Sequence, residues 1–184
     1  MSESDLKGSW AILLFGVRRS VRYHNYRRQF FDTLSTWTDF LTIISGGAVV
    51  GFAAGTGQTQ TVATVVFGAL AGLLAALDLV LGFSIKARDH SDLSKRFTRL
   101  EQEMTEIGDS PTEGQLHKIN TTRLEIESEE PPVKRLLDVW CHNELVRALG
   151  HPRSEAYVLG FWQRTFKQFF SFGLDDLKKV DEAK

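Results

Sequence analysis

No charged residue occurs between Phe40 and Leu77, and this gap decides how the rest of the sequence is interpreted. Two apolar segments fill the gap, separated by the polar stretch GTGQTQT. A chain of 184 residues has too small a core to cover two such segments in succession. The missing charge therefore argues against an ordinary soluble domain, even though the whole chain is 24% charged with a formal net charge of -1.

Cysteine is nearly absent as well. Cys141 is the single cysteine, so no disulfide can form within the chain, and we expect a reducing cytoplasm around the polar parts. We also expect no secretory signal peptide, because the early apolar run WAILLFGV is short and no basic segment precedes it.

Signatures of catalysis are missing from the sequence. Cys141 and His142 are adjacent, and neighbours on a helix point about 100° apart, which does not suit a nucleophile and its base. The histidines are scattered, without the i, i+4 pair of metal ligands that a helix can present. The stretch GTGQTQT lacks the lysine of a phosphate-binding loop. We therefore expect no enzyme activity, no metal site and no cofactor.

The sequence does contain a predicted membrane hairpin. Its two spans cover about residues 40–57 and 62–85, and roughly 20 residues suffice to cross the hydrocarbon core of a bilayer. The hairpin at 40–85 separates an Arg-rich amphipathic N-terminal helix at 1–39 from a cytoplasmic helical stalk and bundle at 86–184. The predicted fold class is an all-α integral membrane protein with a two-helix transmembrane hairpin.

Apolar residues at helical spacing place the helices outside the hairpin. They predict one helix over residues 10–36 and a continuation of the second span as far as Gly108. Ser110 is the expected cap of the next helix, with Pro111 and Glu113 in its first turn and an end before Pro131. Two further helices are expected over residues 133–149 and 155–172.

Positive charge flanks the hairpin on both sides, and the turn between its spans has none. Before the first span lie Arg18, Arg19, Arg22, Arg27 and Arg28, and after the second lie Lys86, Arg88, Lys95, Arg96 and Arg99. Because basic residues stay on the cytoplasmic side, both termini are expected in the cytoplasm. Trp37 lies just before the first span, where an indole ring anchors at the membrane interface.

Small residues recur every four positions in both spans. They are Gly47, Gly51 and Gly55 in the first span and Gly68, Gly72 and Ala76 in the second. Such rows let two helix backbones approach closely. The rows either pack against each other within one hairpin, merely fill the spans, or join different copies; we expect contacts between copies as well, and hence a homo-oligomer.

Asp78 is the only acidic residue inside the apolar stretch, and an unpaired carboxylate in lipid costs several kcal/mol. Counting along the helix places it near the cytoplasmic interface, where it either pairs with Lys86 or headgroup water, or lines the mouth of a cation-selective pore. Thr42 and Ser45, with Thr38, form a weakly polar stripe and are the other pore-lining candidates, although such hydroxyls often bond their own backbone.

The arginine cluster RRSVRYHNYRR interleaves cations with aromatic rings. Contact with anionic lipid headgroups is the expected role of Arg18, Arg19, Arg22, Arg27 and Arg28. A nucleotide contact is the alternative, since arginine binds phosphate and tyrosine stacks on a base. Binding of nucleic acid is not expected, because the chain is close to neutral.

Together these segments resemble the SLATT domain family, a two-helix membrane module of bacterial and phage conflict systems. The resemblance covers about residues 15–150 and rests on RRSVRYHNYRRQFF, the two apolar spans, KARDHSDLSKRFTRLEQE and LEIESEEPPVKRLLDVWCHNE. The positions that match recurrent family residues are His90, Glu130, Pro131, Cys141, Asn143 and Glu144. We expect these residues to be structural, with Asn143 and Glu144 bonding helix termini or pairing with Arg96 or Arg99.

The resemblance implies a pore-forming effector of antiphage defence, located in the bacterial inner membrane and acting by abortive infection. Such a protein would disrupt the membrane as an oligomer and stay inactive until a cytoplasmic trigger acts. Its expected partners are membrane lipids, other copies of itself and either a sensor protein or a nucleotide second messenger. Two alternatives remain: a membrane-anchored interaction module for a partner protein, and a small channel or transport subunit.

Overall fold

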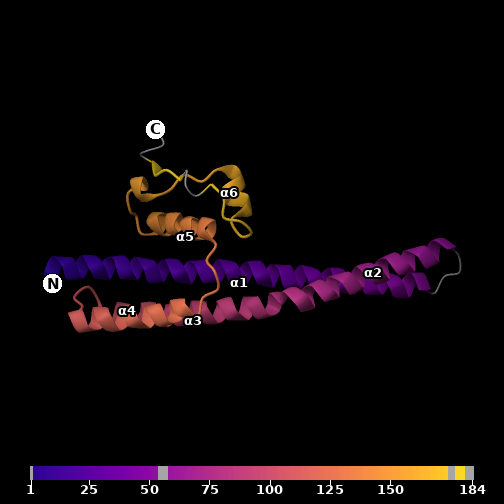
Figure 1. Ribbon diagram of the computed structural model, residues 1–184, viewed down its shortest axis with the longest axis horizontal. Coiled ribbons are helices and arrows are strands. Elements are labelled where there is room, and N and C mark those ends of the chain that lie inside the picture. Colours follow the sequence, from indigo (N-terminus) through magenta and orange to yellow (C-terminus); the bar gives the residue numbers. More distant parts are fainter. Residues whose placement is uncertain (1, 54–57, 174–176, 181–184) are drawn as a thin grey trace. The chain divides into compact units, whose positions relative to one another are not determined.

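The computed structural model describes residues 2–53, 58–173 and 177–180. These residues form six α-helices and one 3-10 helix, shown in Figure 1. The elements are α1 (Glu3–Ala53), α2 (Gln58–Leu81), α3 (Phe83–Ile107), α4 (Glu113–Ser128), α5 (Arg135–Ala148), η1 (Arg153–Glu155) and α6 (Phe161–Phe166). Within the described ranges no β-strand occurs, only a single bridge between Tyr157 and Lys179. The all-helical fold class is therefore confirmed.

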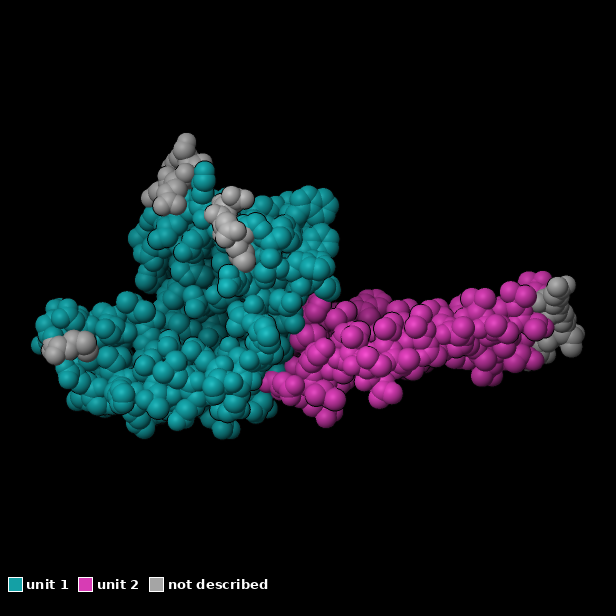
Figure 2. All heavy atoms as spheres, in the orientation of Figure 1, with its two compact units in different colours: residues 1–27, 90–184 teal, residues 28–89 magenta. Residues whose placement is uncertain are grey.

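The chain divides into two compact units, which Figure 2 distinguishes by colour. Unit 1 contains Met1–Arg27 and His90–Lys184, and unit 2 contains Arg28–Asp89. Unit 2 is one continuous segment, whereas unit 1 consists of two, and α1 and α3 each contribute residues to both units.

Unit 2 is a helical hairpin. Four contacts join α1 to α2 and the start of α3: the rings of Phe31 and Phe83 stack, Ser35 bonds Ser84 at 2.8 Å, Val49 lies against Gly68, and the rings of Phe52 and Phe67 stack. Residues near the middle of α1 contact residues of α3, and residues late in α1 contact residues early in α2, so the two arms of the hairpin are antiparallel. Two helices, Glu3–Ala53 and Thr59–Ile107 when α2 and α3 are taken together, are long and apolar enough to cross a membrane. Residues 55–57 of the predicted polar turn lie outside the described residues.

Unit 1 has an ordinary apolar core at heptad-like spacing along three helices. Its buried residues are Trp10, Leu13 and Val17 of α1, Leu93, Phe97, Leu100 and Met104 of α3, and Ile119 and Ile126 of α4. A second cluster of Tyr23, Leu137 and Cys141 attaches α5 to α1. The apolar spacing in the sequence predicted the buried faces of α1 and α3.

Two predictions about helix continuity need correction. The predicted helix at 10–36 and the first span are parts of one helix, because no residue in α1 breaks the backbone pattern within Glu3–Ala53. The second span and the stalk are interrupted at Gly82, whose φ of 59° lies in the left-handed region that favours glycine. Backbone bonds continue on each side, since Gly82 N donates to Asp78 O and Lys86 N donates to Gly82 O.

The C-terminal part departs further from the prediction. The cap of α4 is Thr112 rather than Ser110, because the Thr112 hydroxyl accepts from Gln115 N while the Gln115 side chain returns to Thr112 N. The single helix predicted over residues 155–172 is wrong. After η1 the chain is extended, Val158 N donates to Lys178 O, and only the short α6 is helical.

Candidate functional site

The two helices of unit 2 meet along a seam of residues spaced alternately by three and four, the pattern of paired helices. We call this set the hairpin seam: Phe31, Ser35, Thr38, Thr42, Ser45, Val49 and Phe52 of α1, facing Thr64, Phe67, Ala71, Leu74 and Asp78 of α2. Four consecutive seam positions of α1, from Ser35 to Ser45, carry hydroxyl groups. The α1 side of the hairpin seam is thus polar along its middle.

The outer surface of the hairpin is apolar. Between Trp37 and Ile85 more than a dozen large apolar side chains are exposed, among them Ile43 at 72%, Val50 at 73% and Leu79 at 84%. In water this surface would be unfavourable by roughly 1 kcal/mol per half-exposed side chain, or on the order of 10–20 kcal/mol in total. Covering this surface with an apolar environment would therefore be strongly favourable.

Asp78 faces the seam, as do the other two pore-lining candidates. Its Oδ1 atom is buried and has no hydrogen-bond partner among the described residues. Lys86, considered above as its partner, instead places its ammonium group 5.8 Å from the centre of the Phe31 ring. Thr42 Oγ1 donates to Thr38 O at 2.8 Å, and Ser45 is 3% exposed. Asp78 is the seam residue whose polar atom is left for water, a proton or an ion.

Three of the four described glycines in these rows have no close neighbour. A Cβ atom added at Gly47, Gly51 or Gly72 would meet nothing within 4 Å in the described part of the chain, whereas one at Gly68 would lie 3.7 Å from Val49. Gly47 and Gly51 each follow a seam residue by two positions, which is 200° around the helix. This geometry leaves the α1 row open to a second molecule. Gly55 lies outside the described residues, and Ala76 is exposed.

Most of the clustered arginines bind groups of the same unit. Arg18 pairs with Glu101 at 2.8 Å, Arg19 with Asp138 at 3.1 Å, and Arg27 Nη1 donates to Gln168 O at 2.8 Å. In unit 2, Arg28 pairs with Asp32 at 3.7 Å. Arg22 Nη1 donates to the carbonyl of Arg18, at 3.5 Å. These pairs reduce the charge left for lipid headgroups or a nucleotide.

Unit 1 also contains a buried chain of three titratable groups, which we call the histidine cluster: His24, His90 and Glu130. The Nδ1 atoms of His24 and His90 are 2.9 Å apart, and His24 Nε2 lies 3.0 Å from Glu130 Oε1. His24 is 1% exposed and His90 3%. His24 also stacks on Phe97, so the cluster ties α1 and α3 to the link between α4 and α5.

Protonation in this cluster is restricted by its geometry. With the Glu130 carboxylate ionised, His24 Nε2 carries the proton that it donates. Only one proton fits between the facing Nδ1 atoms, so at most one of the two rings is an imidazolium. Burial, and then the charges of His24 and Arg27, lower the pKa of His90 to about 3. His90 is therefore the neutral ring at ordinary pH.

The other family-matched residues hold α5 in place. Tyr26 Oη donates to Glu144 Oε1 at 2.8 Å, while Asn143 bonds both the N–H and the carbonyl of Tyr157. Asn143 and Glu144 were expected to bond helix termini or to pair with Arg96 or Arg99; here they bind Tyr157 and Tyr26, and Arg96 binds Glu129. Burial raises the pKa of the Cys141 thiol, which keeps it protonated and unsuited to nucleophilic attack. Pro131 is exposed in the link that follows Glu130.

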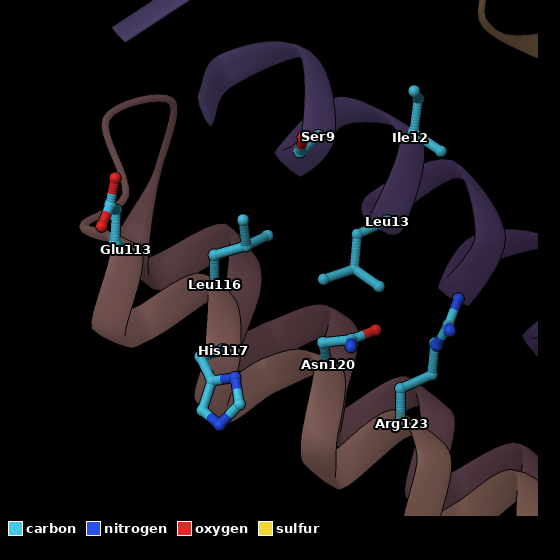
Figure 3. Close-up of a pocket in the computed structure, with 8 residues that line it drawn as sticks. All are labelled: Ser9, Ile12, Leu13, Glu113, Leu116, His117, Asn120 and Arg123. Atoms are coloured by element: carbon cyan, nitrogen blue, oxygen red, sulfur yellow. The ribbon is translucent and has the colours of Figure 1, made fainter. Parts of the chain in front are cut away.

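A pocket of about 580 Å³ lies between the first turns of α1 and α4, as Figure 3 shows. Leu13 and Leu116 form its apolar part, and Ser9, Asn120 and Arg123 supply polar groups. Arg123 Nε already lies 3.5 Å from Glu127 Oε1. No group of three or more metal-ligating side chains is placed around a common centre anywhere in the described ranges.

Sequence reasoning missed this pocket and the role of His24. His24 is separated from His90 by 66 positions and from Glu130 by 106, so no local spacing signals the cluster. Comparison with protein-family models, curated proteins and solved structures gave no match. The SLATT resemblance therefore stays an interpretation of the sequence.

Proposed function

We propose that this protein is an oligomeric, membrane-disrupting effector, held inactive until a trigger acts on its cytoplasmic helices. The polarity of unit 2 carries this proposal: hydroxyl groups and Asp78 occupy the seam, while large apolar side chains cover the outside. Lipid is the environment that stabilises such an arrangement. The SLATT resemblance supplies the antiphage role in the bacterial inner membrane.

Association of copies through the glycine rows is the second part of the proposal. A single hairpin encloses too little space for a conduction path, so several polar seams would have to face a common axis. Gly51 and Gly72 have room for a neighbouring backbone, which is how small residues bring membrane helices together. Asp78 would then favour cations at the mouth of the pore.

Depolarisation of bacteria during induced expression tests the proposal. We expect the wild-type protein, with its trigger or at high abundance, to abolish membrane potential and admit a small dye. The Gly51→Leu, Gly72→Leu double variant should lose this effect at equal membrane abundance, because leucine side chains separate the backbones.

The matched control is the Ala53→Leu, Val66→Leu double variant. It adds two leucines to the same helices at exposed positions that lie off the glycine rows. Depolarisation should persist in this control. Equal depolarisation by the glycine variant and the wild type would refute assembly through these rows, and full function after exchange of the hairpin for an unrelated one would favour the anchored interaction module.

A further inference from the structure

An exposed aromatic patch occupies the C-terminal part of unit 1. We define the aromatic patch as Phe161, Trp162, Phe166, Phe169, Phe170 and Phe172, six large rings within twelve residues. The exposed fractions of Phe161, Trp162 and Phe170 are 73%, 63% and 60%. An apolar surface of this density marks an interaction site rather than ordinary solvent-facing structure.

The patch is held in shape by its own polar residues. Gly160 N donates to Gln163 Oε1 at 2.9 Å, and Gln163 Nε2 donates to Gly173 O at 3.1 Å, which joins the two ends of the segment. The rings contact one another as well, with Trp162 stacked on Phe166 at 5.8 Å and 15°. The aromatic surface is therefore preorganised.

Other polar residues of the segment turn toward the rest of unit 1. Gln168 receives two hydrogen bonds from Arg27 Nη1, at 2.8 and 3.1 Å. The Lys167 ammonium group lies 4.5 Å from the centre of the Trp140 ring, and the Ser171 hydroxyl accepts from Arg135 N. Polar side chains thus face the protein while aromatic rings face outward, which is the reverse of a water-exposed segment.

We propose that the aromatic patch inserts into the headgroup region of a lipid bilayer. Tryptophan and phenylalanine are the rings that favour this boundary. No acidic residue occurs from Ala156 to Gly173, whereas Arg164 and Lys167 are present, so the charge of the segment complements anionic headgroups. Gln168 of this segment is bound by Arg27 and by the carbonyl of Tyr26, and both residues belong to α1, the helix that carries the first apolar segment.

This inference rests on the membrane location given under Proposed function, but not on pore formation. A second copy of the chain is the competing occupant. The two occupants differ in what surrounds Trp162: lipid tails quench an indole when they carry bromine, whereas a protein interface shields it from both bromine and aqueous iodide.

The experiment uses the full-length chain in vesicles that contain anionic lipid, prepared with and without brominated acyl chains. One variant keeps Trp162 by carrying Trp37→Phe and Trp140→Phe; a second keeps Trp37 by carrying Trp140→Phe and Trp162→Phe. Trp10 is 4% exposed and common to both. We expect brominated lipid to quench Trp162 and to shift its emission to the blue. Quenching of Trp162 by iodide alone, or by neither agent, would overturn the proposal.

Trp37 separates failure of this inference from failure of the proposed function. If brominated lipid quenches Trp37 but not Trp162, the hairpin is inserted and the patch is not; if it quenches neither, membrane insertion itself is refuted. In the Trp162 variant, adding Phe161→Gln and Phe170→Gln should lower the lipid quenching by at least half. Ile12→Gln, at a 75% exposed apolar position elsewhere in unit 1, should leave it unchanged.

Discussion

Acidification should destabilise unit 1 through His90. The folded protein holds the pKa of His90 at about 3, against roughly 6.5 in an unfolded chain. Above pH 6.5 both states are neutral at this ring and it contributes no pH dependence. Below that value the unfolded state takes up a proton that the folded state refuses, so the free energy of unfolding falls as the pH drops toward 3.

The size of the effect follows from the two pKa values. At pH 5, about 1.5 units below the pKa of the unfolded ring, protonation stabilises the unfolded state by about 2 kcal/mol. His24, Arg27 and the ring of Tyr23 lie near His90, and Glu130 lies beyond His24, on its other ring nitrogen. Burial raises the pKa of Asp138, so protonation of this carboxyl group on acidification favours the folded state, opposite to the effect of His90. A comparison of variants is therefore needed to isolate His90.

Urea unfolding of the full-length protein in lipid nanodiscs, followed by tryptophan fluorescence at pH 7 and pH 5, measures the effect. His90→Gln should be less stable at pH 7 but should lose about 2 kcal/mol less than the wild type on acidification. His117→Gln removes an exposed histidine and should keep the wild-type dependence. An identical change with pH in His90→Gln and the wild type would refute the assignment of a neutral, buried His90.

Three further outcomes follow from single side chains. Asp78→Asn should lower the cation preference of any current measured in planar bilayers, since it removes the seam's carboxylate; unchanged selectivity would place Asp78 away from the ion path. Asn143→Ala should cost about 1–3 kcal/mol in the same urea unfolding, because the N–H and carbonyl of Tyr157 both lose a partner, and a loss below 0.5 kcal/mol would contradict those bonds. Thr112→Ala should cost about 1 kcal/mol through loss of the α4 cap, whereas Ser110→Ala should be neutral; the reverse order would restore Ser110 as the cap.

Local spacing predicted much of the fold. Apolar residues at three- and four-residue intervals gave the faces of α1 and α3, and Gly108 and Gly150, with φ of 76° and 70°, stand where α3 and α5 were expected to end. The helix predicted over residues 155–172 failed because its first part is held by distant partners. Asn143 and Lys178 bind that backbone from outside the segment, and no periodicity within it reveals them.

The candidate site was less accessible to sequence reasoning. Asp78 and the glycine rows stood out by composition. The sequence does not show whether each glycine row faces the other helix of the hairpin or the outside, and the choice between packing within one hairpin and packing between copies depends on this. The histidine cluster needed more still, because three segments of unit 1 supply its members. His90 and Glu130 were singled out only through the family resemblance, and their mutual partner His24 was not.

The burial pattern changes character along α1, and this supports the membrane location independently of span length. Near its start the inward residues are Trp10, Leu13 and Val17, as in any soluble helical core. Beyond Phe31 the inward positions become Ser35, Thr38, Thr42 and Ser45, while Ile43 and Val50 are exposed. A single solvent cannot favour both patterns, since water drives apolar groups inward and lipid leaves no such drive. The switch within one continuous helix is the pattern expected if α1 passes from water into a bilayer, as proposed above.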